Sequence, residues 1–197
     1  MKDFPWGTLW SLMFMTMGPI RAVAVFSNVG ASDDAPGVRE LATRATAIVA
    51  AAFIMTVLIG NSVLLAWGVS FPVLIGTGGL ILAILSLQNI LTVQSVPGAP
   101  LDATKMSAAA IAFPGLFPPI AVTIPLIFAV PFPGYETKIA IIGMGLGLIA
   151  LNWLLMCRSK AIMRVIGPVP LQLAGAVFGV LQLALGFEFI VDAFRML

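Results

Sequence analysis

The chain has 197 residues, of which 60% are hydrophobic and 9% are charged, with a mean hydropathy of +1.11 and a formal net charge of +2. Because soluble domains carry about 25% charged residues, this composition indicates an integral membrane protein that forms one domain over residues 1–197. The chain has no histidine, which excludes imidazole ligands and Ser-His or Cys-His nucleophiles, so we expect no enzyme, no catalytic residue, no metal and no cofactor. It also has no run of basic residues, so we expect no nucleic-acid partner.

Six apolar stretches are long enough to cross a bilayer core of roughly 30 Å, which takes about 20 residues of helix. In chain order they cover residues 5–27, 45–69, 71–93, 106–130, 139–157 and 169–194. The loop of residues 94–105 contains Pro97, Gly98 and Pro100 and separates two halves, at about 5–93 and 106–194. The predicted fold class is therefore all-α, with six transmembrane helices.

Proline interrupts the first and the fourth stretch. Pro19 follows Gly18, and Pro119 follows Pro118, 100 residues later. Proline inside a helix removes a backbone hydrogen bond at a cost of about 3 kcal/mol, and paired breaks in two halves point to a binding site in transporters built from repeats. The segments 78–80 (Gly-Gly-Leu) and 179–181 (Gly-Val-Leu) match at nearly the same offset, 101. Three spans in each half insert in opposite directions, so we expect an inverted 3+3 repeat with proline-broken helices 1 and 4.

The half-helix ends at these breaks are the candidate substrate site, because helix N-termini carry about +0.5 charge and free N–H groups. Kinks that merely shape packing are the alternative. Arg21, inside span one, binds an anionic group, or it snorkels to the interface or forms a structural ion pair. Amides within spans line a substrate path or make interhelical hydrogen bonds, and they include Gln88, Asn89, Gln172 and Gln182. The candidate substrate-binding residues are Pro19, Arg21, Asn61, Pro119, Thr123 and Asn152.

Positive charge concentrates in the loops after spans one, three and five. By the positive-inside rule these loops are cytoplasmic and both termini are outside. The residues on the predicted cytoplasmic side are Arg39, Arg44, Lys105, Arg158, Lys160 and Arg164. Those on the other side are Lys2, Lys138 and Arg195.

Several segments in order resemble the MarC family of membrane proteins over nearly the whole chain. They are residues 18–20 (Gly-Pro-Ile) with 24–26, 78–81 (Gly-Gly-Leu-Ile), Pro119, 161–167 and 186–190. The resemblance implies a six-span protein of the bacterial inner membrane, in a family with members implicated in moving small neutral amino acids. The chain departs from the family pattern at Gly18, where asparagine is usual, and in the apolar segment 120–125. The chain is therefore similar to a divergent member of the MarC family.

The resulting hypothesis is a transporter of small neutral amino acids or similar metabolites, whose halves rock around a site at the two breaks. The alternative is a non-transporting accessory or structural subunit of a larger membrane complex, which the apolar fourth span favours. The expected partners are the lipid bilayer, a small-molecule substrate and either further copies of the chain or such a complex.

Overall fold

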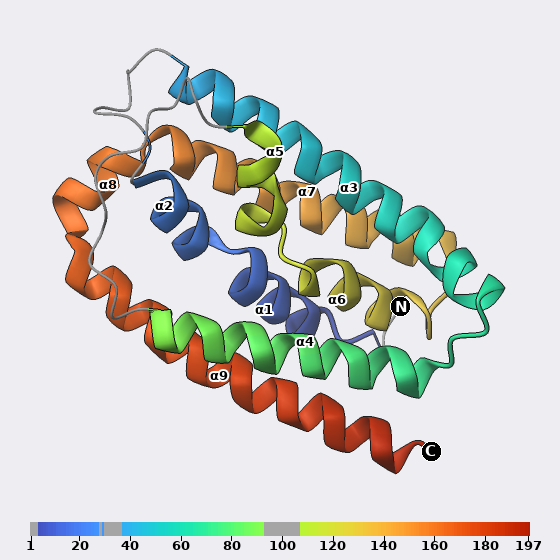
Figure 1. The fold of residues 1–197 in the computed structure, drawn as a ribbon. Helices are drawn as coiled ribbons and strands as arrows, with labels where there is room; N and C mark the ends of the chain where they lie inside the picture. The colour runs from blue at the N-terminus through green and yellow to red at the C-terminus, as the bar shows by residue number, and fades with distance from the viewer. Residues whose placement is uncertain (1–3, 28, 30–36, 93–106) are drawn as a thin grey trace.

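The computed structural model describes residues 4–27, 29, 37–92 and 107–197, and every regular element within them is a helix (Figure 1). Nine of these elements are α-helical and one is a π-helix, η1. In chain order they are α1 (Trp6–Met17), α2 (Pro19–Ser27), α3 (Val38–Ala66), α4 (Phe71–Thr92), α5 (Ala108–Ala110), η1 (Ile111–Leu116), α6 (Ile120–Ala129), α7 (Tyr135–Cys157), α8 (Ser159–Ile166) and α9 (Pro168–Arg195).

Four helices of the described chain, α3, α4, α7 and α9, are long and apolar enough to cross a membrane. The shortest, α4, has 22 residues, which extend about 33 Å at 1.5 Å per residue. The prediction of an all-α protein with membrane-crossing helices is confirmed. By contrast, α1 with 12 residues and α6 with 10 are each too short to cross a core of roughly 30 Å alone.

Two predicted boundaries differ from the structure because hydropathy does not register polar helical turns. Helix α3 begins at Val38 rather than at residue 45, and its first turns contain an ion pair of 2.5 Å between Arg44 and Glu40, one helical turn apart. The segment after span five was expected to be a loop but contains α8, in which basic and apolar residues alternate with helical spacing.

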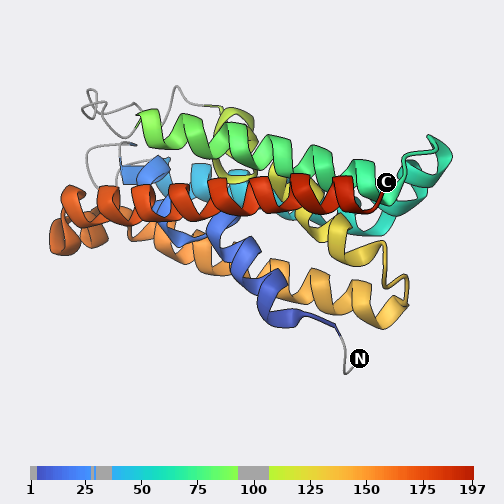
Figure 2. The ribbon, with the colours of Figure 1, turned by 90° about the horizontal axis from the view of Figure 1, so that it is seen from below.

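The helices form two outer pairs with the short helices between them. Helices α4 and α9 run antiparallel side by side, as Figures 1 and 2 both show, and α3 packs against α7 on the other side. Helices α1, α2, η1 and α6 lie in the middle; α1, α2 and α6 each contact both pairs, and η1 contacts α3. The start of α1 and the end of α9 lie at one end of the bundle, and α8 lies at the opposite end (Figure 1).

The backbones of α4 and α9 touch at glycines. A Cβ atom built on Gly79 would lie 2.5 Å from the carbonyl oxygen of Gly186, and one built on Gly186 would lie 2.8 Å from the amide nitrogen of Ala83. Any larger side chain would therefore push the two helices apart. Small residues at membrane helix contacts allow this close van der Waals packing.

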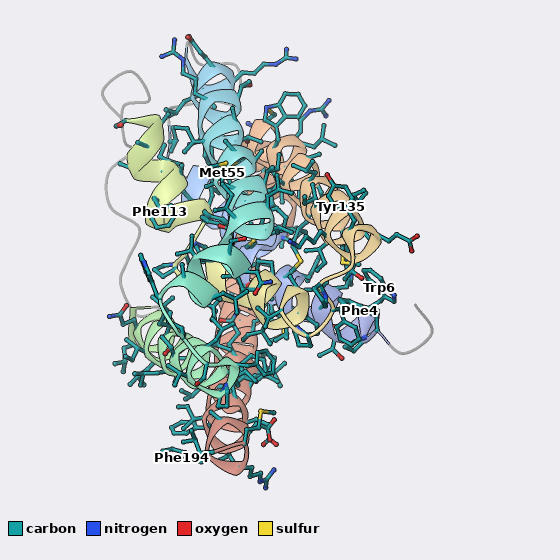
Figure 3. The ribbon with its side chains drawn as sticks, turned by 90° about the vertical axis from the view of Figure 1, so that its right-hand side faces the viewer. Phe4, Trp6, Met55, Phe113, Tyr135 and Phe194 are labelled. Atoms are coloured by element: carbon teal, nitrogen blue, oxygen red, sulfur yellow. The ribbon has the colours of Figure 1, made fainter. Side chains whose placement is uncertain are left out.

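The surface of the bundle is apolar. Large hydrophobic side chains are exposed on each long helix, among them Met55 on α3 and Phe194 on α9, which Figure 3 labels. Soluble monomers rarely expose contiguous apolar surface on this scale, so lipid covers these side chains. The interior is also apolar, with Phe26, Phe53 and Phe117 fully buried.

Candidate functional site

The first helix break lies at Gly18, between α1 and α2. Gly18 is extended, with φ −78° and ψ 179°, and Pro19 begins α2. The ring of a proline clashes with a helical residue before it, which explains the extended backbone. A Cβ atom on Gly18 would lie 1.7 Å from the carbonyl oxygen of Phe14, so this turn admits glycine alone without moving the backbone.

Two side-chain amides bind the carbonyl groups that the break leaves without helical partners. The carbonyl of Met15 would normally accept from the N–H four residues later, but Pro19 has none. Gln182 Nε2 on α9 donates to this carbonyl at 2.5 Å. Asn152 Nδ2 on α7 donates to the carbonyl of Met17. The break is therefore held by one amide from each outer helix pair.

The Gln182 amide also approaches α4. Ser86 Oγ donates to the Leu82 carbonyl at 2.6 Å and lies 3.5 Å from Gln182 Oε1. Ser86 is fully buried and Gln182 is 8% exposed. This buried chain of polar groups joins α4, α9 and α1 in an otherwise apolar interior.

Among the residues that the structure describes, two buried side-chain oxygen atoms have no hydrogen-bond partner. They are Asn152 Oδ1 and Thr46 Oγ1, and Asn152 is 5% exposed. Trp153, the neighbour of Asn152, donates its indole N–H to Thr43 Oγ1 at 3.0 Å, which brings this part of α7 against the turn of α3 that precedes Thr46. A buried polar atom without a partner costs about 1–3 kcal/mol, so both atoms are available to a polar ligand.

The second helix break lies between η1 and α6. Phe113, which precedes Pro114, has non-helical torsions of −129° and 124°, and the Phe117 N–H donates to the Ala112 carbonyl at 2.8 Å across a π-turn. Pro118 and Pro119 follow, and α6 begins at Ile120. Proline again accounts for the interruption, because it lacks the N–H that a continuous helix would use.

The two breaks lie at the same level in the bundle. On one side of them the rings of Phe4 and Phe128 have centroids 6.0 Å apart, and on the other side Gly115 of η1 faces Val25 of α2. The two interrupted segments therefore run in opposite directions. Pro19 lies between Phe4 and Val25 on the first segment, and Pro119 lies between Gly115 and Phe128 on the second. Figure 1 shows the two interrupted segments side by side in the middle of the bundle.

The other predicted site residues are distributed differently. Thr123, one turn into α6, is buried with its methyl group against Gly78 of α4. Asn61 is half-buried on α3, beside Gly60, which packs on Leu126 in the second half of α6. Asn61 lies eighteen residues after Thr43 on α3, which is about 27 Å along the helix. Because Thr43 contacts Trp153, the neighbour of Asn152, Asn61 is far from Asn152. The backbone of Arg21 is in α2, but its side chain lies outside the described residues.

The family model for MarC family integral membrane proteins matches residues 6–197. The chain belongs to the MarC family. No curated protein and no solved structure matches it. Within the described part of this MarC-family protein, no three His, Cys, Asp or Glu side chains gather as they would at a metal site.

Sequence reasoning placed Asn152 at the site of this MarC-family protein, and the structure joins it to the first break. The sequence identifies Gln182 as an amide within a span but does not assign it to the site, and it gives no reason to select Thr46. The sequence does indicate that a donor is needed, because Pro19 leaves the carbonyl of Met15, four residues earlier, without its helical partner. Which amide supplies that donor depends on the packing of α9 against α1.

Proposed function

We propose that this protein is a MarC-type membrane transporter of small neutral amino acids or metabolites of similar size, and not an enzyme. The observation that carries the proposal is the buried oxygen of Asn152, an acceptor beside a broken helix that has no partner within the described part of the chain. The start of α2 offers free N–H groups to a carboxylate, and Asn152 Oδ1 offers an acceptor to an ammonium group. A small zwitterion needs both.

The proposal includes six spans arranged as an inverted 3+3 repeat. Residues 6–27, which contain α1 and α2, and residues 108–129, which contain α5, η1 and α6, would each form one interrupted span, since 22 residues of helix extend about 33 Å. The antiparallel pairs α4 with α9 and α3 with α7 support this arrangement, because each pairs a helix with its counterpart in the other half. Rocking of the halves would expose the site to alternate sides.

We further propose a bacterial inner-membrane location with both termini outside. Arg39, Arg158 and Arg164 lie at the α8 end of the bundle, whereas Lys138 and Arg195 lie near its other end. The excess of positive charge at the α8 end supports a cytoplasmic assignment for it.

Uptake of radiolabelled alanine, serine and glycine into proteoliposomes tests the proposal. We expect uptake that Asn152→Leu and Arg21→Ala each reduce at least tenfold, because a buried hydrogen bond to a charged group contributes about 1.5–3 kcal/mol. Gln172→Leu, an exposed amide on α9, serves as the matched control and should transport normally. Absence of uptake by the folded protein, with no amino-acid-dependent rise in its melting temperature, would overturn the assignment.

A non-transporting accessory subunit is the second candidate. The burial and apolar character of α6 favour it, because Thr123 packs on Gly78 and the helix otherwise contains apolar side chains. In that case the two amides at the first break serve packing alone. Purification from the native membrane in mild detergent distinguishes the candidates, since an accessory subunit elutes with a stoichiometric partner and a transporter elutes alone or with copies of itself.

A further inference from the structure

Helix α8 has two chemically different faces. It has eight residues and connects the membrane helices α7 and α9 at one end of the bundle (Figures 1 and 2). Lys160 and Arg164 are four residues apart and share one face, while Ile162, Val165 and Ile166 lie on another. This is the pattern of a helix that lies in the plane of a membrane interface.

The apolar face of α8 projects from the bundle. Val165 is 86% exposed and Ile166 is 49% exposed, and Val169, at the start of α9, continues the exposed strip. The helix is anchored on the bundle at Ser159, which is buried, and α8 contacts α2. Because α7 and α9 cross the bilayer, the exposed strip lies where the acyl chains begin. Burial of its apolar side chains among these chains is favourable, since it removes them from water.

Arg158 and Arg164 have no acidic residue near them in the chain. Arg158 and Arg164 are exposed, and no aspartate or glutamate occurs between residues 137 and 187. At the same end of the bundle, the described Glu40 is already paired with Arg44. Phosphate groups of lipids flank the hydrocarbon core that membrane helices cross, and Arg binds phosphate through two parallel hydrogen bonds.

We propose that α8 is a binding surface for anionic phospholipids, with Arg158 and Arg164 holding headgroup phosphates and the Val165 strip inserted among the upper acyl chains. Each basic residue near an anionic membrane surface contributes about 1 kcal/mol. The surface does not depend on the proposed transport, because it lies at the end of the bundle away from the helix breaks.

Lipid titration of the full-length protein in detergent, followed by native mass spectrometry, tests the headgroup contacts. Phosphatidylglycerol should bind more tightly than phosphatidylcholine with the same acyl chains, and Arg158→Gln/Arg164→Gln should weaken this binding about 30-fold. Lys138→Gln/Arg195→Gln removes the same charge at the other end and should leave it unchanged. Equal binding of the two lipids, an equal loss in both variants, or full competition by millimolar inorganic phosphate would overturn the proposal.

A spin label on Val165→Cys, in a Cys157→Ala background, tests the insertion in vesicles containing phosphatidylglycerol. Electron paramagnetic resonance should show that oxygen, which concentrates in acyl chains, relaxes this label more than a water-soluble nickel complex does. A label on Arg164→Cys should show the opposite preference. If nickel relaxes both labels equally, α8 lies in water and the proposed surface is wrong.

Discussion

The hydrogen bond from Gln182 to the Met15 carbonyl can be removed with little other change. Gln182→Leu retains the size and helix propensity of the side chain but removes the donor. The carbonyl then has no helical donor, because Pro19 lacks an N–H, and the site is buried. A buried acceptor left unpaired costs about 1–3 kcal/mol, and interhelical bonds in membranes contribute about 0.6–1.7 kcal/mol. We expect the free energy of unfolding to fall by about 1–2 kcal/mol.

Reversible unfolding by steric trapping in bicelles measures this free energy. Gln172→Leu is the matched control, because Gln172 lies ten residues earlier on the same helix and is exposed. It should change the free energy of unfolding by less than about 0.5 kcal/mol, as exposed substitutions do. If both variants lower the stability equally, the Met15 carbonyl does not depend on Gln182 and the explanation of the break fails.

Three further predictions use the same unfolding assay. Asn152→Leu should lower the free energy of unfolding by about 1–2 kcal/mol. A decrease smaller than that caused by an exposed substitution would contradict the role of Asn152 at the break. Gly18→Ala should cost at least about 2 kcal/mol because its Cβ meets backbone, whereas Gly143→Ala, with open space around it, should stabilise by about 0.5–1 kcal/mol. Gly186→Ala should cost about 1–3 kcal/mol by separating two helices, while Gly175→Ala on the same helix should be neutral or stabilising. Equal effects within either glycine pair would refute the close contacts.

The long helices were predictable because an uninterrupted apolar run has one stable conformation in a bilayer. The predicted span of residues 71–93 begins with α4 and ends one residue after it, and that of 139–157 ends with α7. The position of α8 was not predictable by hydropathy, since its basic residues cancel its apolar residues in any average along the chain. The helix is indicated instead by spacing: Lys160 and Arg164 are four residues apart, and Ile162, Val165 and Ile166 follow at three- and four-residue intervals.

The partners at the first break illustrate a different limit. Gln172 and Gln182 are both single amides in an apolar span, and nothing in their neighbours along the chain distinguishes them. One is exposed and the other is buried against α1, because the glycine contact with α4 fixes how α9 is rotated. The need for a donor follows from Pro19, but its source is a property of the tertiary structure.

The donors at the first break have a consequence for how the protein is made. Met15 and Met17 are synthesised early, whereas Asn152 and Gln182 follow 135 and 167 residues later. At about 5–20 residues per second, the interrupted first helix waits roughly 7–33 s for them. Until then its carbonyls must bind water or the insertion machinery, because hydrocarbon offers no donor. The N-terminal half can therefore be inserted early but can complete its structure only when the final helix arrives.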